Sequence, residues 1–196
     1  MKMAVRMTVL ASGSRGNCTV VSSSQGSILV DAGLSCRETL RRMRAAGEDP
    51  HQLQAVVISH EHADHVAGLQ VLAQKLKLPI YMTGATYQSW RRWARDKEGK
   101  PAKLDHVEYF EAGRCFSVND ITIMPFTIPH DAADPCGFTF KAGGVKIGIV
   151  TDLGCNADLH ATSLEGEAAR VSGIEDRHCH RFGLHDRQHQ RSPALL

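Results

Sequence analysis

The segment Ala55-Val56-Val57-Ile58-Ser59-His60-Glu61-His62-Ala63-Asp64-His65 decides the fold and the chemistry predicted for this chain. Its first half is an apolar run typical of a buried strand. Its second half places four side chains that bind metals within six positions. At a strand end, alternate residues such as His60 and His62 point to one side. A following turn would bring Asp64 and His65 to a neighbouring point, so this segment is expected to serve two metal ions.

The residue types narrow the choice of metal. Imidazole and carboxylate ligands together favour zinc, manganese or iron over calcium. A single histidine usually lies on the surface or in the core, but three histidines and an aspartate directly after an apolar strand indicate a metal site. We therefore expect two divalent ions here, zinc or manganese.

Two further candidate ligands, His130 and Asp152, each follow a predicted strand. Binding sites in α/β folds gather where strands end. We expect His130 to complete a first metal site with His60 and His62, and Asp152 to bridge both metals. Taken alone, His130 and Asp152 are equally consistent with ordinary turn residues.

The predicted chemistry is hydrolysis. Two metals roughly 3.5–4 Å apart can share a water and lower its pKa toward neutrality. The resulting hydroxide would attack a phosphorus or carbonyl centre while the metals neutralise charge on the substrate oxygens. Asp64 is the predicted catalytic residue, because it can both bind one metal and accept a hydrogen bond from that water.

Composition sets broad limits on the class of protein. The chain has 196 residues, 42% of them apolar, which predicts one domain with a sizeable core. The net charge of +2 does not indicate any particular class of binding partner. No apolar run reaches 18 residues, so no membrane span is expected. The six cysteines lack C-x-x-C spacing and the first residues are too short in apolar length for a signal peptide, so we expect free thiols and a cytoplasmic protein.

The order of predicted elements is strands alternating with helices, followed from Val107 by a strand-rich stretch. This order predicts a mixed α/β chain with both crossovers and hairpins. Ser35 and Glu38 fit a capping box that begins a helix, and Asn119-Asp120 and Gly143-Gly144 are typical of hairpin turns. Strands are expected at 7–11, 18–22, 27–31, 55–59, 79–82, 107–110, 116–118, 121–127, 138–141 and 145–151, and helices at 36–46, 66–76 and 85–95.

The candidate ligands, in this order and after an aspartate that follows a strand (Asp31), resemble the metallo-β-lactamase superfamily. The stretches 10–18, 58–62 and 127–132 are similar to its bacterial WalJ/YycJ-type exonuclease branch. The resemblance covers about residues 5–155. It implies an αββα sandwich with the metals at one edge of two facing sheets. It also implies a cytoplasmic metal-dependent hydrolase that acts on DNA as a 5′ exonuclease.

The resemblance also assigns ligands. It places His60, His62 and His130 at the first metal and Asp64 and His65 at the second. Asp152 matches the bridging position. An aspartate there is similar to the phosphodiesterase and thioesterase branches, whereas the lactamases place a cysteine there.

Residues 156–196 depart from the family pattern. They hold five of the eleven histidines and five arginines, but no lysine and one aromatic residue. In the family, this part adds strands and helices and delivers a last histidine to the second metal. We therefore predict a family-like domain over 1–155 and an atypical, disordered tail over 156–196. A shifted reading frame in a G+C-rich gene is one hypothesis for this composition.

This departure predicts an incomplete second half of the fold. We expect the inner faces of the strands between 107 and 151 to lose partners and expose apolar surface. The second metal is expected to lack a ligand.

DNA binding requires positive charge near the site. Residues 85–104 carry six Lys or Arg against two acidic residues, and Arg91 and Arg92 lie between two tryptophans. Such a segment can grip phosphates and stack on unpaired bases, or it can be a solvated helix face whose tryptophans belong to the core. Arg15, in the glycine-rich loop 12–17, is a further candidate phosphate contact or an ordinary turn residue.

Three functions are consistent with the sequence. The first is the DNA exonuclease, and the second is a hydrolase of a small ester or thioester with the same metal centre. The third is an inactive fragment that binds metal. A basic groove would favour the first and a closed apolar pocket the second.

Overall fold

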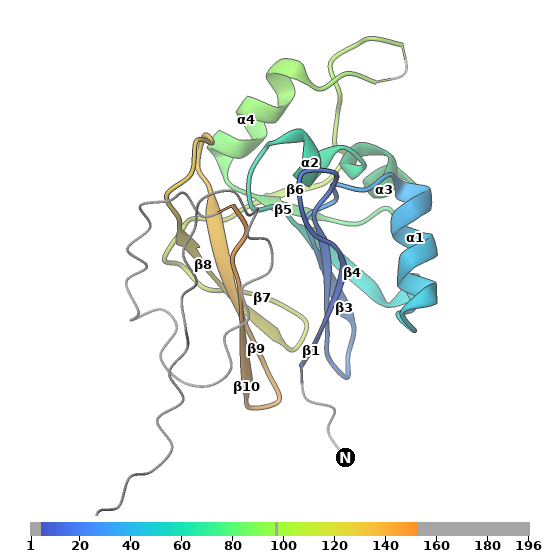
Figure 1. Cartoon of the computed structure of the whole chain (residues 1–196). Coiled ribbons are helices and arrows are strands. Elements are labelled where there is room, and N and C mark those ends of the chain that lie inside the picture. Colours follow the sequence, from blue (N-terminus) through green and yellow to red (C-terminus); the bar gives the residue numbers. More distant parts are fainter. Residues whose placement is uncertain (1–4, 97, 153–196) are drawn as a thin grey trace, which may run out of the picture.

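The computed structural model describes residues 5–96 and 98–152, which form two facing β-sheets with helices against one of them (Figure 1). The six-stranded sheet has the order β1 (Arg6–Ala11), β2 (Cys18–Ser22), β3 (Ser27–Val30), β4 (Leu53–Val57), β5 (Ile80–Met82), β6 (Val107–Tyr109). The four-stranded sheet has the order β10 (Val145–Ile149), β9 (Cys136–Ala142), β8 (Ile121–Thr127), β7 (Phe116–Val118). Strands β3 to β6 run parallel, and all other pairs are antiparallel.

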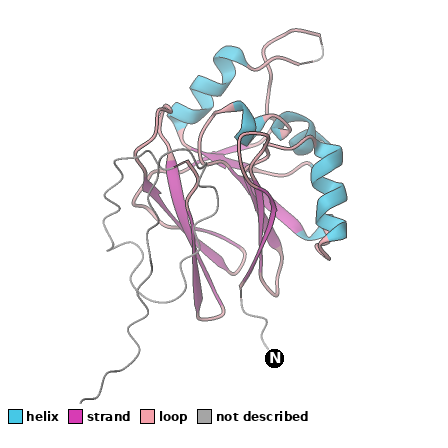
Figure 2. Cartoon of the chain, viewed as in Figure 1, coloured by secondary structure: helices cyan, strands magenta, loops and turns pink. Residues whose placement is uncertain are grey.

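The helices lie in the crossover connections that parallel strands require. They are α1 (Cys36–Ala45), the 3₁₀ turn η1 (Pro50–Gln52), α2 (Ala63–Val66), α3 (Leu69–Leu76) and α4 (Gly84–Trp93). Figure 2 shows that, in the described residues, the helices gather beside the six-stranded sheet. The predicted cap of α1 is confirmed, since the Ser35 side chain accepts from the Glu38 N–H.

The six-stranded sheet separates two hydrophobic cores. Because side chains alternate along a strand, Val56 packs against the helices while its neighbour Val57 packs against the second sheet. Strand β4 is therefore apolar except for Gln54, as expected for a strand covered on both faces.

The inner face of the second sheet is buried, which contradicts the predicted loss of partners. Phe138, Phe140 and Ile123 are each at most 1% exposed. The six-stranded sheet covers these residues in one shared core with Val57 and Ile28. The expectation was wrong because the first sheet supplies partners for this face.

The helix predicted over 66–76 is two helices. Gly68 interrupts it because its N–H donates to the Ala32 carbonyl at 2.8 Å. A Cβ at this glycine would lie 1.9 Å from the Leu34 carbonyl oxygen, so only glycine allows this approach. Asp64 and His65 lie on the short helix α2, which begins at Ala63, and not in the predicted turn. The predicted turns at Asn119-Asp120 and Gly143-Gly144 are confirmed, and each residue but Asp120 has a positive φ.

The topology brings the candidate ligands to one edge. The parallel strands β3 and β4 end at the same side of their sheet, and β8 and β10 both run antiparallel to β9. The segments after these strands carry Asp31, His60, His130 and Asp152.

Some predictions lie outside the described residues, namely the boundary at 155 and everything expected of 156–196. In the described part of the chain, the cysteines are free: Cys18, Cys36, Cys115 and Cys136. No helix there is long and apolar enough to cross a membrane.

Candidate metal centre

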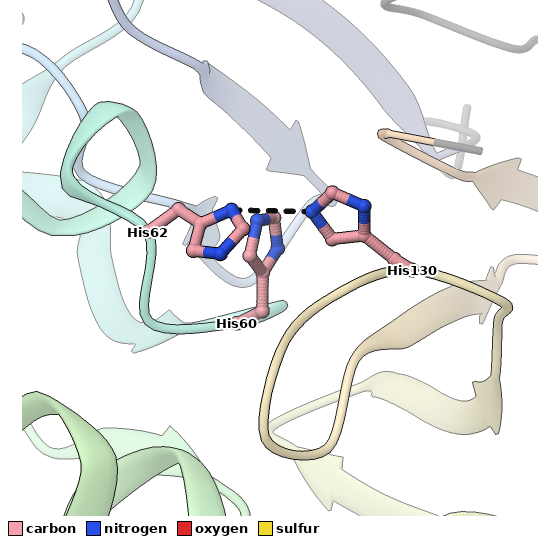
Figure 3. A group of neighbouring side chains, drawn as sticks. All are labelled: His60, His62 and His130. Carbon is pink, nitrogen blue, oxygen red and sulfur yellow. Dashed lines mark hydrogen bonds between the residues drawn. The ribbon is translucent and has the colours of Figure 1, made fainter. Parts of the chain in front are cut away.

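Three histidines from both sheets converge at this edge, as Figure 3 shows. His60 and His62 follow β4, and His130 lies in the loop between β8 and β9. Their ring centroids are 4.7–4.9 Å apart. The Nε2 atom of His130 lies 3.2 Å from Nδ1 of His62. One nitrogen from each ring lies within 4.8 Å of the others, a spacing that suits one metal ion.

A second group lies beside the first. His60, His65 and Asp152 each offer one atom within 4.8 Å of the others. The Asp152 Oδ2 atom is 2.6 Å from His65 Nε2 and 3.6 Å from His60 Nε2. Asp152 therefore belongs to the second group and lies close to His60, the residue that the two groups share. Asp64 reaches the second group from α2, with Oδ2 3.7 Å from His65 Nε2. The structure thus brings all six predicted ligands together.

Asp31 supports the second group through its contact with His65. It is 1% exposed and adopts a φ of +60°, which an aspartate tolerates better than most residues. Its carboxylate accepts hydrogen bonds from the Ser59 N–H and hydroxyl and lies 2.8 Å from His65 Nδ1. This contact orients the His65 ring so that Nε2 faces Asp152, in the manner of carboxylates behind metal-bound histidines.

Burial and neighbouring charges shift the pKa values of His60 and His65 in opposite directions. Burial, assisted by the positive charge of His65, lowers the pKa of His60 to about 3. Burial also opposes charge on His65, but Asp31 and Asp152 outweigh it and raise the pKa of His65 to about 10. Asp152 is itself partly buried, yet its hydrogen bond with His65 lowers the pKa of its carboxyl. Without a metal the centre therefore contains a neutral His60 imidazole beside a His65–Asp152 ion pair, and a divalent ion would have to displace the His65 proton before Nε2 could bind it.

The residues fit a divalent ion on structural grounds. The Nε2 atom of His60 is fully buried and has no hydrogen-bond partner among the described residues. An orphaned buried nitrogen is costly unless something binds it. Its near neighbours are imidazole nitrogens and a carboxylate oxygen, which are the ligands that zinc and manganese accept. The other nitrogen of His130 also has a partner, since its Nδ1 atom lies 3.1 Å from the Asp131 Oδ1 atom.

Sequence reasoning missed two buried polar residues at the centre. The Nδ2 atom of Asn17 lies 3.2 Å from Asp64 Oδ2. Glu61 accepts the Ala133 N–H at 2.9 Å and so fastens the loop that carries His130. Glu61 lies inside the histidine motif, and Asn17 ends the glycine-rich loop, so their positions were the only available signals.

The candidate DNA contacts occupy two places. Arg15 is exposed on the loop that Asn17 joins to Asp64. Arg91 and Arg92 are exposed on α4, which follows β5 at the edge where the ligands gather. Arg91 lies over the Tyr87 ring at 5.5 Å. The two tryptophans differ, since Trp90 is 2% exposed and belongs to the core and Trp93 is 47% exposed.

Comparison with known proteins identifies the family. The sequence profile described as "Beta-lactamase superfamily domain" matches residues 27–171. The chain belongs to the metallo-β-lactamase superfamily. Its members are metal-dependent hydrolases, so the fold and the hydrolase class expected from the sequence are confirmed. The match reaches residue 171, and the domain boundary expected at residue 155 stays a prediction.

Two relatives within the superfamily are exodeoxyribonucleases. Exodeoxyribonuclease YycJ of Bacillus anthracis is 33% identical over 169 residues, which are 86% of this chain and 62% of that protein. Exodeoxyribonuclease WalJ of Streptococcus pneumoniae is 32% identical over 160 residues, or 82% of this chain and 58% of that protein. The chain therefore spans about six-tenths of the length of these relatives.

Solved structures support the fold alone. A metallo-β-lactamase of Cronobacter sakazakii with an HARLDQ motif superposes with a TM-score of 0.63 at 18% identity, covering 78% of this chain and 63% of that one. MEM-A1, a subclass B3 metallo-β-lactamase from a soil metagenome library, gives a TM-score of 0.61 at 18% identity and covers 81% and 64%. The sandwich is thus the superfamily architecture.

Proposed function

We propose that this chain is a metal-dependent phosphodiesterase that removes nucleotides from the 5′ end of DNA. The observation that carries the proposal is that two donor groups share His60, with Asp152 of the second group 3.6 Å from the His60 Nε2 atom. The similarity to two exodeoxyribonucleases over more than four-fifths of the chain supports DNA as the substrate.

In this proposal, six residues hold two divalent ions, zinc or manganese. His60, His62 and His130 hold the first, and their mutual spacing within 4.8 Å supports that assignment. Asp64 and His65 hold the second. The position of Asp152 between His60 and His65 supports a shared ligand.

Bound divalent ions supply Lewis acidity, which activates water and neutralises charge on phosphate oxygens. The protein's own residues prepare that chemistry. Asp31 lies 2.8 Å from Nδ1 of His65, so Nε2 faces the centre and its lone pair would be free for a metal once the Nε2 proton is displaced. Asp64 is partly exposed and its carboxylate faces the same point, where it can accept a proton from an attacking water.

The proposed DNA surface is basic and lies beside the centre. Arg15, Arg91 and Arg92 are exposed and form no salt bridge in the described residues. The exposed ring of Trp93 adds a face on which an unpaired base can stack. A strand that crosses α4 would reach the loop of Arg15 at the edge where β4 ends.

The deciding experiment follows release of nucleotides from DNA labelled at the 5′ or the 3′ end, with Mn²⁺ or Zn²⁺ and with a chelator. We expect metal-dependent release of the 5′ label as mononucleotide and no release with the chelator. Absence of metal-dependent release from either end would overturn the proposal. Hydrolysis of a small ester or thioester without DNA cleavage would favour the alternative hydrolase, and tight metal binding without turnover would favour the inactive fragment.

Matched arginine variants test the surface. We expect Arg91→Ala and Arg92→Ala to raise KM, leave kcat within about twofold, and each reduce the salt dependence of DNA binding by about one phosphate contact. Arg44→Ala is the control, because Arg44 is an exposed arginine at the far end of α1. Equal effects of Arg44→Ala and Arg91→Ala would remove α4 from the substrate path.

A further inference from the structure

Asn17 is a buried polar residue that ties three separate segments of the centre together. It is 3% exposed and ends the loop 12–17. Its backbone N–H donates to the Asp64 carbonyl at 2.7 Å, and its carbonyl accepts the Gly33 N–H at 2.9 Å. These two bonds belong to the backbone, so they fix the position of residue 17 whatever its side chain is.

The side-chain amide has a defined orientation. Its Oδ1 atom accepts the Gly13 N–H at 3.0 Å. A backbone N–H can only donate, so Oδ1 must be the atom that faces it, and Nδ2, which also lies 3.4 Å from the Gly13 carbonyl oxygen, is the donor end of the amide. Nδ2 then lies 3.2 Å from Asp64 Oδ2 and 2.9 Å from His65 Nε2. The amide therefore presents a fixed donor beside both atoms assigned to the second metal.

We infer that Asn17 is a positioning residue for the second metal position. Its Nδ2–H donates to Asp64 Oδ2 and holds that carboxylate next to His65, so that two ligands converge before a metal arrives. The inference rests on the proposed function, because it assumes that Asp64 and His65 bind an ion. Asp64 needs such support, since it lies on a helix of four residues and is partly exposed.

The geometry predicts how strongly removal of the Asn17 amide weakens metal binding and which of the two metals it affects. Loss of an outer partner of a metal ligand typically costs about 10–100-fold in metal affinity. In the described part of the chain, the Asn17 side chain bonds to Gly13, Asp64 and His65, and to none of His60, His62 and His130. Removal of the amide should therefore weaken one metal equivalent and spare the other.

The test is a metal titration of the metal-free full chain by calorimetry, with Zn²⁺ or Mn²⁺. Wild type should bind two equivalents, and Asn17→Ala should weaken the second by about 10–100-fold and leave the first within about threefold. Asn119→Ala is the matched control, because Asn119 is an amide in the distant β7–β8 turn, bonded to the Gln25 carbonyl. It should change neither equivalent.

A double-mutant cycle separates positioning from a general structural role. If Asn17 acts through Asp64, then Asn17→Ala should add little to the loss that Asp64→Ala causes at the second equivalent. Additive losses, equal losses at both equivalents, unchanged affinities, or a wild type that binds a single equivalent would each overturn the inference. The proposed function fails separately, by the absence of metal-dependent DNA cleavage in the wild type.

Discussion

Gly33 is the most crowded glycine at the centre, and replacing it by alanine is the sharpest test of the structure. A Cβ at position 33 would lie 1.7 Å from the Asp64 carbonyl oxygen and 2.6 Å from the Asn17 backbone nitrogen. Ordinary contacts begin near 3.4 Å. The overlapping atoms are backbone, so no change of rotamer relieves the overlap, and the 12–17 loop or α2 must shift.

The shift has a cost that the structure allows to be worked out. It would break the buried bonds from Asn17 N–H to the Asp64 carbonyl and from Gly33 N–H to the Asn17 carbonyl. Unsatisfied buried groups cost about 1–3 kcal/mol each, and overpacking adds about 1–3 kcal/mol. We therefore expect Gly33→Ala to lower the free energy of unfolding by at least about 3 kcal/mol, a large share of a typical domain's stability of about 5–15 kcal/mol.

The assay is urea unfolding of the metal-free chain, followed by circular dichroism and by fluorescence of the buried Trp90. Gly84→Ala is the matched control, because a Cβ at the start of α4 meets nothing within 4 Å. It should change stability by no more than about 1 kcal/mol. A Gly33→Ala chain within 1 kcal/mol of wild type would refute the close approach of the three backbones.

Three other perturbations have expected outcomes. Asp31→Asn removes the charge that faces His65 and should cost about 3 kcal/mol in the urea assay; a wild-type midpoint would contradict the buried pair. Glu61→Ala frees the Ala133 N–H, so it should cost about 1–3 kcal/mol and weaken the metal equivalent that depends on the His130 loop, as calorimetry would detect. Hydrogen bonds from Arg41 and Arg42 lower the pKa of Glu38 to about 2 from an ordinary 4.5. These ion pairs therefore stabilise the fold above pH 4.5 and are lost as pH falls toward 2, so Glu38→Gln should flatten the acid limb of a stability–pH curve; an unchanged limb would count against the pairs.

The sequence predicted the elements whose signals are local. Strand β4 lies within two residues of its predicted start and end because an apolar run identifies a strand covered on both faces. The turns at Asn119 and at Gly143-Gly144 were predictable because a positive φ favours these residue types. The six candidate ligands could be named because each belongs to a short motif that follows a strand.

Features that depend on distant partners were not predictable. Asn17 and Asp64 are 47 positions apart, and only the fold brings the amide to the carboxylate. The break between α2 and α3 is caused by Gly68 packing on the Leu34 carbonyl, whereas the apolar spacing around it continues as if one helix were present. The burial of the second sheet's inner face likewise depends on the facing sheet and not on the strands' own neighbours in sequence.

The centre is built across the two sheets, and its geometry therefore depends on how they pack. His60, His62, Asp64 and His65 come from the first sheet through β4, whereas His130 and Asp152 come from the second through β8 and β10.

Besides the contacts among the ligands themselves, two hydrogen bonds from backbone N–H groups join the sheets at this edge. The Cys136 N–H donates to the Ser59 carbonyl at 3.0 Å, and the Ala133 N–H donates to Glu61 at 2.9 Å. Ser59 and Glu61 are the neighbours of His60 in the chain, so both bonds fix the position of His60 relative to β9 and the loop before it. Because a bound ion would join the same two sheets, metal binding and sandwich packing reinforce each other. The H-x-H-x-D-H motif is thus half of a site, and the buried core between the sheets aligns it with the other half.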